Sequence, residues 1–192
     1  MRACGRRFAG KDERMEKGLI HLYTGDGNGK TTAAIGLAVR AAGAGKQVLF
    51  VQFMKGRDTG ELYGLAQVKG IEILRSEKDF GFYASMTEEQ KEELAGIHNE
   101  LLRKTMDRAQ SGRAQVIILD EVTYPLRWKL LDEELLWQLL ARTEEKRFYP
   151  EIVCTGRNAP KELEECADYL TRMDAVRHPY EKGIGARRGI EF

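Results

Sequence analysis

Glycines, a lysine and two threonines lie close together near the start of the chain, in the stretch GDGNGKTT at residues 25–32. Glycines leave the backbone free to curl, so that its N–H groups can point inward at phosphate oxygens. Lys30 would supply a positive charge for the terminal phosphates, and the hydroxyl of Thr31 or Thr32 could bind Mg²⁺. A helix that starts near Lys30 would direct the positive end of its dipole at the same anion. The stretch therefore predicts a site for a nucleoside triphosphate.

The loop departs from the usual phosphate-binding pattern, G-x-x-x-x-G-K-[ST], at its first position. Thr24 stands where the first glycine is expected, and the glycine follows at position 25. A loop of altered length is compatible with a shifted position of the bound phosphates along the loop. A kinase or ATPase exposes the γ-phosphorus to an attacking oxygen, whereas attack on the 5′ carbon of the nucleotide expels the whole triphosphate. The loop by itself leaves both kinds of chemistry open.

Two carboxylates end a second informative stretch, AQVIILDE at residues 114–121. Asp120 would hold Mg²⁺ directly or through water, and Glu121 would be either a second metal partner or a base. A glycine loop alone is a weak signal. The order of strand, glycine loop, GKTT, helix and a later VIILDE strand is a strong one, and it predicts a triphosphate site with a divalent metal.

Short apolar runs alternate with amphipathic stretches along the chain. Strands are expected at residues 18–23, 47–53, 71–74, 114–121 and 151–156, and helices at residues 30–42, 87–110, 131–140 and 160–167. Thr87 and Gln90 form a capping-box pattern at the start of the longest helix. Strands that are apolar throughout indicate a parallel sheet covered by helices on both faces. Because ligands bind at the carboxyl ends of such strands, residues 25–32, 120–121 and 155–157 should converge at one edge.

The composition favours a single α/β domain of residues 18–192. The chain has 192 residues and a formal net charge of +1, which gives no global attraction to nucleic acid or to a membrane. No apolar run is long enough to span a bilayer, and three cysteines without a CxxC pair favour a reducing cytoplasm. Residues 1–17 form a basic extension without a signal-peptide pattern. It would be either a mobile tail or a segment that folds over a bound anion.

Five blocks of the sequence resemble, in order, those of the P-loop type ATP:corrinoid adenosyltransferases of cobalamin biosynthesis. The blocks are TGDGNGKTTAAIGLAVRAAGAGK, VQFMKG, VIILDEVTY, TGRNAP and RHPYEKGIGARRGIEF, and the resemblance covers roughly residues 18–192. It implies a RecA-like P-loop fold, with a mostly parallel sheet and helices on both faces, and a homodimer. It also implies transfer of the 5′-deoxyadenosyl group of ATP to the cobalt(I) of a reduced corrinoid, with Mg²⁺ or Mn²⁺ as cofactor and triphosphate as product.

The resemblance assigns roles to individual residues. Lys30 and Phe82 would be catalytic, and Thr31, Asp120 and Glu121 would hold the metal. The residues that would bind ATP are Gly25, Asp26, Gly27, Asn28, Gly29, Lys30, Thr31, Thr32 and Arg157.

The corrinoid would contact Phe82 and Tyr83. The family often carries Phe-x-Trp on this loop, but the second place is Ala84 here, and Phe80 or Tyr83 is the expected substitute. An apolar ring offers cobalt no donor atom, so Phe82 would displace the lower axial ligand. The resulting four-coordinate cobalt(II) would be reduced by a reduced flavoprotein.

Two other classes of protein share part of this pattern. The first is a P-loop nucleoside kinase or ATPase, in which the same loop would serve phosphoryl transfer. The second is a RecA-like ATPase that moves on nucleic acid, but the chain lacks the basic stripe with interleaved aromatics that such a protein needs.

Overall fold

The described residues of the computed structural model, 17–142 and 149–191, form a six-stranded parallel sheet with helices on both faces. The strands are β1 (Ile20–Thr24), β2 (Val48–Gln52), β3 (Ile71–Arg75), β4 (Val116–Asp120), β5 (Glu151–Thr155) and β6 (Tyr169–Arg172). Their order across the sheet is β3-β2-β4-β5-β1-β6. The predicted α/β class is confirmed, and the carboxyl ends of β1, β4 and β5 lie side by side.

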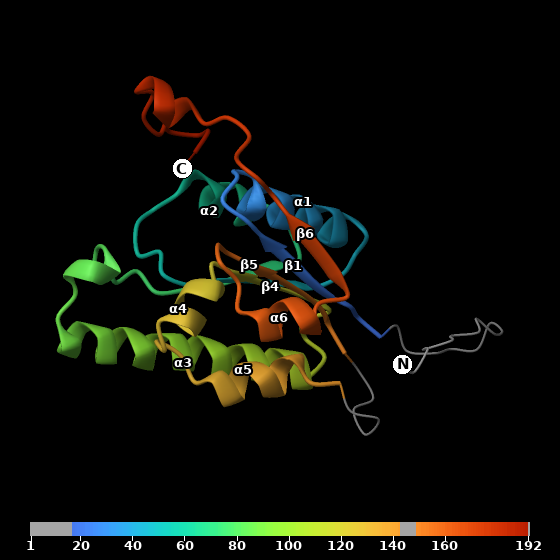
Figure 1. Ribbon diagram of the computed structural model, residues 1–192. Helices are drawn as coiled ribbons and strands as arrows, with labels where there is room; N and C mark the ends of the chain where they lie inside the picture. The colour runs from blue at the N-terminus through green and yellow to red at the C-terminus, as the bar shows by residue number, and fades with distance from the viewer. Residues whose placement is uncertain (1–16, 143–148, 192) are drawn as a thin grey trace, which may run out of the picture.

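Two layers of helices cover the sheet (Figure 1). On one face lie α1 (Lys30–Gly43) and α2 (Gly60–Leu65). On the other lie α3 (Glu88–Gln110), α4 (Thr123–Arg127), α5 (Glu133–Leu140) and α6 (Lys161–Cys166). Short 3₁₀ helices occur at Tyr83–Ser85 and Pro179–Lys182.

The central strands β2 and β4 bury both of their faces, which explains why they are apolar at nearly every position. In β4, Ile117 and Leu119 belong to the core cluster that includes Leu102 of α3 and Leu136 of α5. The alternate residues Val116 and Ile118 pack in a second cluster, whose helical members include Ala34 and Ala38 of α1 and Leu65 of α2. Successive side chains of a strand point to opposite faces, so a strand covered on both sides is apolar at nearly every position, and its polar residues stand at its ends.

The predicted boundaries lie within one or two residues of the observed ones. The capping box is confirmed, since Gln90 N–H donates to Thr87 Oγ1 (3.2 Å) and Thr87 N–H donates to Gln90 Oε1 (2.9 Å). Three short elements, α2, α4 and β6, are not predicted by the sequence pattern. The four residues of β6 are all exposed, so they leave no apolar run in the sequence.

The prediction for the N-terminal extension concerns residues that, apart from Lys17, lie outside the described part of the chain. Lys17 forms an isolated parallel bridge with Tyr149. None of the helices in the described part of the chain combines the length and the apolar composition that a bilayer span requires.

A buried histidine joins α3 to the loop after β2. His98 is 1% exposed; its Nδ1 lies 2.9 Å from the carbonyl oxygen of Leu130, and Met54 N–H donates to its Nε2 over 3.4 Å. Because the Leu130 oxygen only accepts and the Met54 nitrogen only donates, the ring is neutral with its proton on Nδ1. Burial lowers the pKa of His98 from 6.5 to about 4, and the bond to Leu130 opposes this only partly.

This histidine should make the stability of the protein depend on pH. Between the folded pKa of about 4 and the unfolded pKa of 6.5, the unfolded chain binds a proton that the folded chain does not. The free energy of unfolding should therefore fall as the pH falls through this window, by roughly 3 kcal/mol in total. Urea unfolding of the wild type and of His98→Gln at several pH values checks this. The variant should lose the decrease in the free energy of unfolding between about pH 6.5 and pH 4. Equal pH dependence of the two proteins would contradict the assignment of His98 as a buried neutral ring.

Candidate active site

The position at which the usual pattern has its first glycine belongs to a strand in this structure. Thr24 is buried as the last residue of β1 and pairs with Arg172 of β6. The chain turns only at Gly25, where φ is 98°. A Cβ added at Gly25 or Gly27 would lie 2.4 or 2.7 Å from the carbonyl oxygen of Met173, just beyond β6. Both glycines are therefore required by the close approach of the segment that follows β6.

Lys30 is held inside the loop at the start of α1. Gly29, with φ at 106°, is the N-cap residue of α1, and Asn28 Oδ1 accepts a hydrogen bond from its N–H (2.8 Å). The Lys30 ammonium donates to the carbonyl oxygens of Gly25 (2.7 Å) and Gly27 (2.6 Å). Burial, and then the nearby Arg157, lower the pKa of Lys30, against the carboxylates of Glu121 and Asp26. The loop thus contains a poorly hydrated cation beside the dipole of a helix N-terminus.

Asp120, the last residue of β4, is fully buried and receives three hydrogen bonds. Its Oδ1 accepts from the hydroxyls of Thr31 and Thr155, both over 2.8 Å. Its Oδ2 accepts from the ammonium of Lys55 over 3.1 Å. For Lys55, burial lowers the pKa, but Asp120 and Glu121 outweigh it, so the net pKa is raised.

Glu121 follows directly in a strained conformation. Its φ of 61° lies in the left-handed region, which costs a side chain of this kind about 1–3 kcal/mol. Its N–H donates to the hydroxyl of Thr155 (3.0 Å), whereas its Oε2 is buried without a hydrogen-bond partner. Burial and then the Asp120 carboxylate raise the pKa of Glu121, against the opposing charges of Lys55, Lys30 and Arg157. An acceptor oxygen with no partner suits a ligand cation.

These oxygen donors fit Mg²⁺ or Mn²⁺. Thr31, Asp120 and Glu121 present a hydroxyl and two carboxylates, the hard ligands that such cations prefer. Within residues 17–142 and 149–191, no group of three or more His, Cys, Asp or Glu side chains could enclose a metal ion. Mg²⁺ is often bound by one or two carboxylates together with substrate phosphates and water, so the donor set matches a metal that arrives with a nucleotide.

A cleft of about 660 Å³ opens in front of the phosphate loop. The predicted residues that line it are Gly27, Asn28, Gly29, Lys30, Thr31, Thr32, Glu121 and Arg157. Arg157 follows β5, and its carbonyl oxygen accepts from Thr123 Oγ1 (2.9 Å). Gly156, with φ at 142°, makes this approach possible, because a Cβ there would lie 1.9 Å from the same hydroxyl. The structure therefore brings the ends of β1, β4 and β5 together, as predicted from the parallel sheet.

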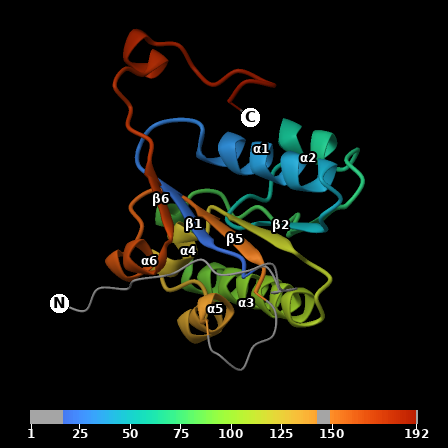
Figure 2. The same cartoon turned by 90° about the vertical axis from the view of Figure 1, so that its right-hand side faces the viewer.

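Two further parts of the cleft were not predicted from the sequence. Lys55 and Glu61, from the segment after β2 and from α2, line one wall. The segment after β6, which Figure 2 shows running above α1, contributes His178, Ala186, Gly189, Ile190 and Glu191. Lys55 lies just past the carboxyl end of β2, so the strand-end rule that found Asp120 could also have found it. Nothing in the local sequence indicates where the last segment folds.

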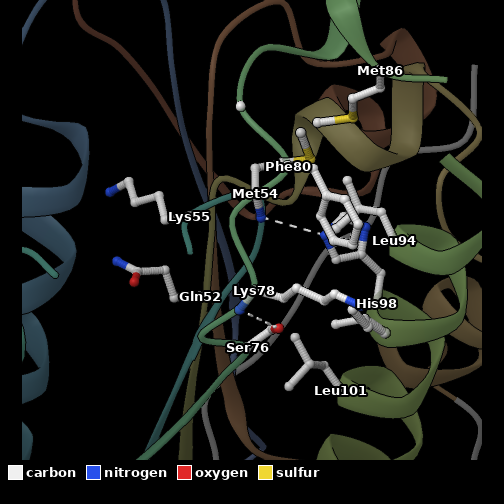
Figure 3. Close-up of a pocket in the computed structure, with 12 residues that line it drawn as sticks. Gln52, Met54, Lys55, Ser76, Lys78, Phe80, Met86, Leu94, His98 and Leu101 are labelled. Carbon is white, nitrogen blue, oxygen red and sulfur yellow. Dashed lines mark hydrogen bonds between the residues drawn. The ribbon is translucent and has the colours of Figure 1, made fainter. Parts of the chain in front are cut away.

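The predicted corrinoid residues lie outside the lining of this cleft, on the segment between β3 and α3. Phe82 is 83% exposed. Tyr83 stacks on Trp128, with ring centroids 4.3 Å apart and planes inclined by 6°. Phe80 instead turns inward and lines a cavity of about 10 Å³ with Met86 and other side chains (Figure 3). Of the three aromatics, only Phe82 presents most of its ring to solvent.

The sequence was also compared with known proteins. A family model described as "ATP:corrinoid adenosyltransferase BtuR/CobO/CobP" matches residues 16–192. The chain belongs to this family. A corrinoid adenosyltransferase of Sinorhizobium sp is 34% identical over 188 residues, which cover 92% of this chain and 81% of that protein. Corrinoid adenosyltransferases of Escherichia coli strain K12 and Salmonella typhimurium strain LT2 are each 30% identical, over 177 and 178 residues, covering 92% of this chain and 87% of each relative.

The close packing of the loop against Met173 predicts a specific effect of Gly27→Ala. The added methyl group meets a backbone oxygen that cannot move aside, so the loop must shift away from its binding geometry. We expect ATP affinity, measured by calorimetry with Mg²⁺, to fall at least about tenfold while the fold is kept. Gly36→Ala is the matched control, because a Cβ at Gly36 in α1 has no atom within 4 Å. Unchanged affinity in Gly27→Ala would refute this description of the loop.

Proposed function

We propose that the protein transfers the 5′-deoxyadenosyl group of ATP to the cobalt(I) of a reduced corrinoid and releases triphosphate. The observation that carries this proposal is the family match over residues 16–192, which includes the whole of the phosphate loop and the Asp120–Glu121 pair. No observation favours phosphoryl transfer, the chemistry of the kinase alternative.

The reaction needs no proton transfer. The cobalt(I) electron pair forms a bond to C5′ of ATP, the C5′–O5′ bond breaks, and its electron pair leaves on the triphosphate. A general base is therefore unnecessary, and the protein has to align the two substrates and stabilise the leaving group. Lys30, Arg157 and the N–H groups of residues 25–32 would hold the triphosphate, which suits the poorly hydrated ammonium inside the loop.

A divalent metal would assist at the leaving group. Thr31, Asp120 and Glu121 would hold Mg²⁺ or Mn²⁺, whose positive charge would offset the charge of the departing triphosphate. The support from the structure is the oxygen-rich donor set and the unpartnered Oε2 of Glu121.

The corrinoid would lie against the segment between β3 and α3. Phe82 would close over the lower face of the ring and displace the axial ligand, and its exposed ring supports this role. Tyr83 would assist from its place beside Trp128. From the family resemblance we also infer a homodimer in the cytoplasm, supplied with electrons by a reduced flavoprotein.

Substitutions of Phe82 and of Lys30 should have different effects on the rate of adenosylation. Because Phe82 would ease the reduction of cobalt(II), Phe82→Ala should slow adenosylation that begins from cob(II)alamin with a reductant far more than adenosylation of pre-reduced cob(I)alamin. Lys30 would stabilise the leaving group in both, so Lys30→Ala should slow both about 100-fold, the effect of losing one charge-assisted contact in a water-poor site. Corrinoid absorbance follows both reactions.

Each outcome bears on a separate assignment. Equal losses from both starting states in Phe82→Ala would remove its role in ligand displacement. Near-normal turnover of Lys30→Ala with cob(I)alamin would contradict the proposed function itself.

A further inference from the structure

A lysine ammonium lies against the buried carboxylate that would hold the metal. Lys55 Nζ is 3.1 Å from Asp120 Oδ2, and the side chain of Lys55 is 28% exposed whereas that of Asp120 is fully buried. The other oxygen, Oδ1, already accepts from the hydroxyls of Thr31 and Thr155. A cation of the protein itself therefore covers the oxygen of Asp120 that the hydroxyls leave free.

The backbone around Lys55 is held on both sides. On one side Met54 N–H donates to His98 (3.4 Å), and Figure 3 shows Lys55 extending away from this bond, in the same direction as Gln52. On the other side, Arg75 donates to the carbonyl oxygens of Gly56 (2.7 Å) and Arg57 (3.0 Å). These bonds fix the backbone beside Lys55, so a change of partner by its ammonium requires rotation of the side chain alone.

A second carboxylate lies within reach of the same ammonium. Glu61 Oε1, on α2, is 3.7 Å from Lys55 Nζ and is positioned by the Gln52 side chain, whose Nε2 donates to it over 3.3 Å. Glu61 and Lys55 both line the cleft in front of the phosphate loop. The ammonium can thus leave Asp120 without losing an anionic partner.

We propose that Lys55 is a built-in counter-ion that keeps a divalent metal from Asp120 until a triphosphate enters the cleft. The triphosphate changes the balance in two ways. It adds phosphate oxygens to the few protein oxygens at the site, where the described residues include no group of three or more His, Cys, Asp or Glu that could hold a metal. It also gives the Lys55 ammonium, turned toward Glu61, a new anion to bind. Metal and triphosphate would therefore bind together. This inference rests on the proposed metal–triphosphate site and is independent of the corrinoid.

Binding of Mn²⁺ to the full chain, followed by electron paramagnetic resonance with and without inorganic tripolyphosphate, tests the inference. The wild type should bind Mn²⁺ at least about tenfold more tightly when tripolyphosphate is present. Without it, the metal has to displace the charge-assisted bond between Lys55 and Asp120; with it, the phosphate oxygens bind both the metal and the displaced ammonium. Lys55→Met should bind Mn²⁺ without tripolyphosphate about tenfold more tightly than the wild type does. Lys104→Met, which breaks a surface pair with Glu100, is the matched control and should behave like the wild type.

Lys55→Arg extends the test to a variant that keeps the positive charge beside Asp120. Circular dichroism checks that each variant is folded. The arginine fork should hold the carboxylate more firmly, so Mn²⁺ affinity in the presence of tripolyphosphate should fall several-fold. Unchanged Mn²⁺ binding without tripolyphosphate in a folded Lys55→Met, or wild-type behaviour of Lys55→Arg in both conditions, would overturn the inference. If the wild type failed to bind Mn²⁺ even with tripolyphosphate, the proposed metal site would be wrong as well.

Discussion

The buried carboxylate of Asp120 connects the parts of the molecule that form the active site. A carboxylate removed from water costs several kcal/mol unless hydrogen bonds and opposite charge compensate it. Here the compensation comes from Thr31 at the start of α1, Thr155 at the end of β5 and Lys55 after β2. The phosphate loop, the sheet and the wall of the cleft therefore each contribute a group that stabilises this carboxylate. Loss of any one donor would leave part of a buried charge without a partner.

The electrostatic state of the site complements a metal-bound triphosphate. Burial lowers the pKa of Lys30 and raises that of Glu121, so in both groups the charged form is less stable than it would be in water. Phosphate oxygens would favour the charged ammonium, and a divalent cation would favour the charged carboxylate. Binding would thus reverse both shifts. Such an arrangement is fixed before the reaction begins, which is what stabilisation of a leaving group requires.

Much of this arrangement could be predicted from the sequence because it follows from local patterns. Gly25, Lys30 and Asp120 each stand at the end of an apolar run or the start of a helix, and a parallel sheet brings such positions together. The position of Lys55 after a strand is visible in the sequence, but its pairing with Asp120, 65 residues away, depends on β2 lying next to β4 in the sheet, which the order of the elements along the chain does not show. The strand β6 was missed because its exposed residues have no apolar pattern and its place depends on pairing with β1.

The fate of the three phosphates of ATP tests the central claim most directly. Phosphorus NMR of a reaction containing the protein, ATP, Mg²⁺ and chemically reduced cob(I)alamin identifies the product without coupling enzymes. Adenosyl transfer predicts intact tripolyphosphate, in an amount equal to the adenosylated corrinoid formed. Appearance of ADP, or of AMP with pyrophosphate, would place the broken bond between phosphorus and oxygen and would contradict the account.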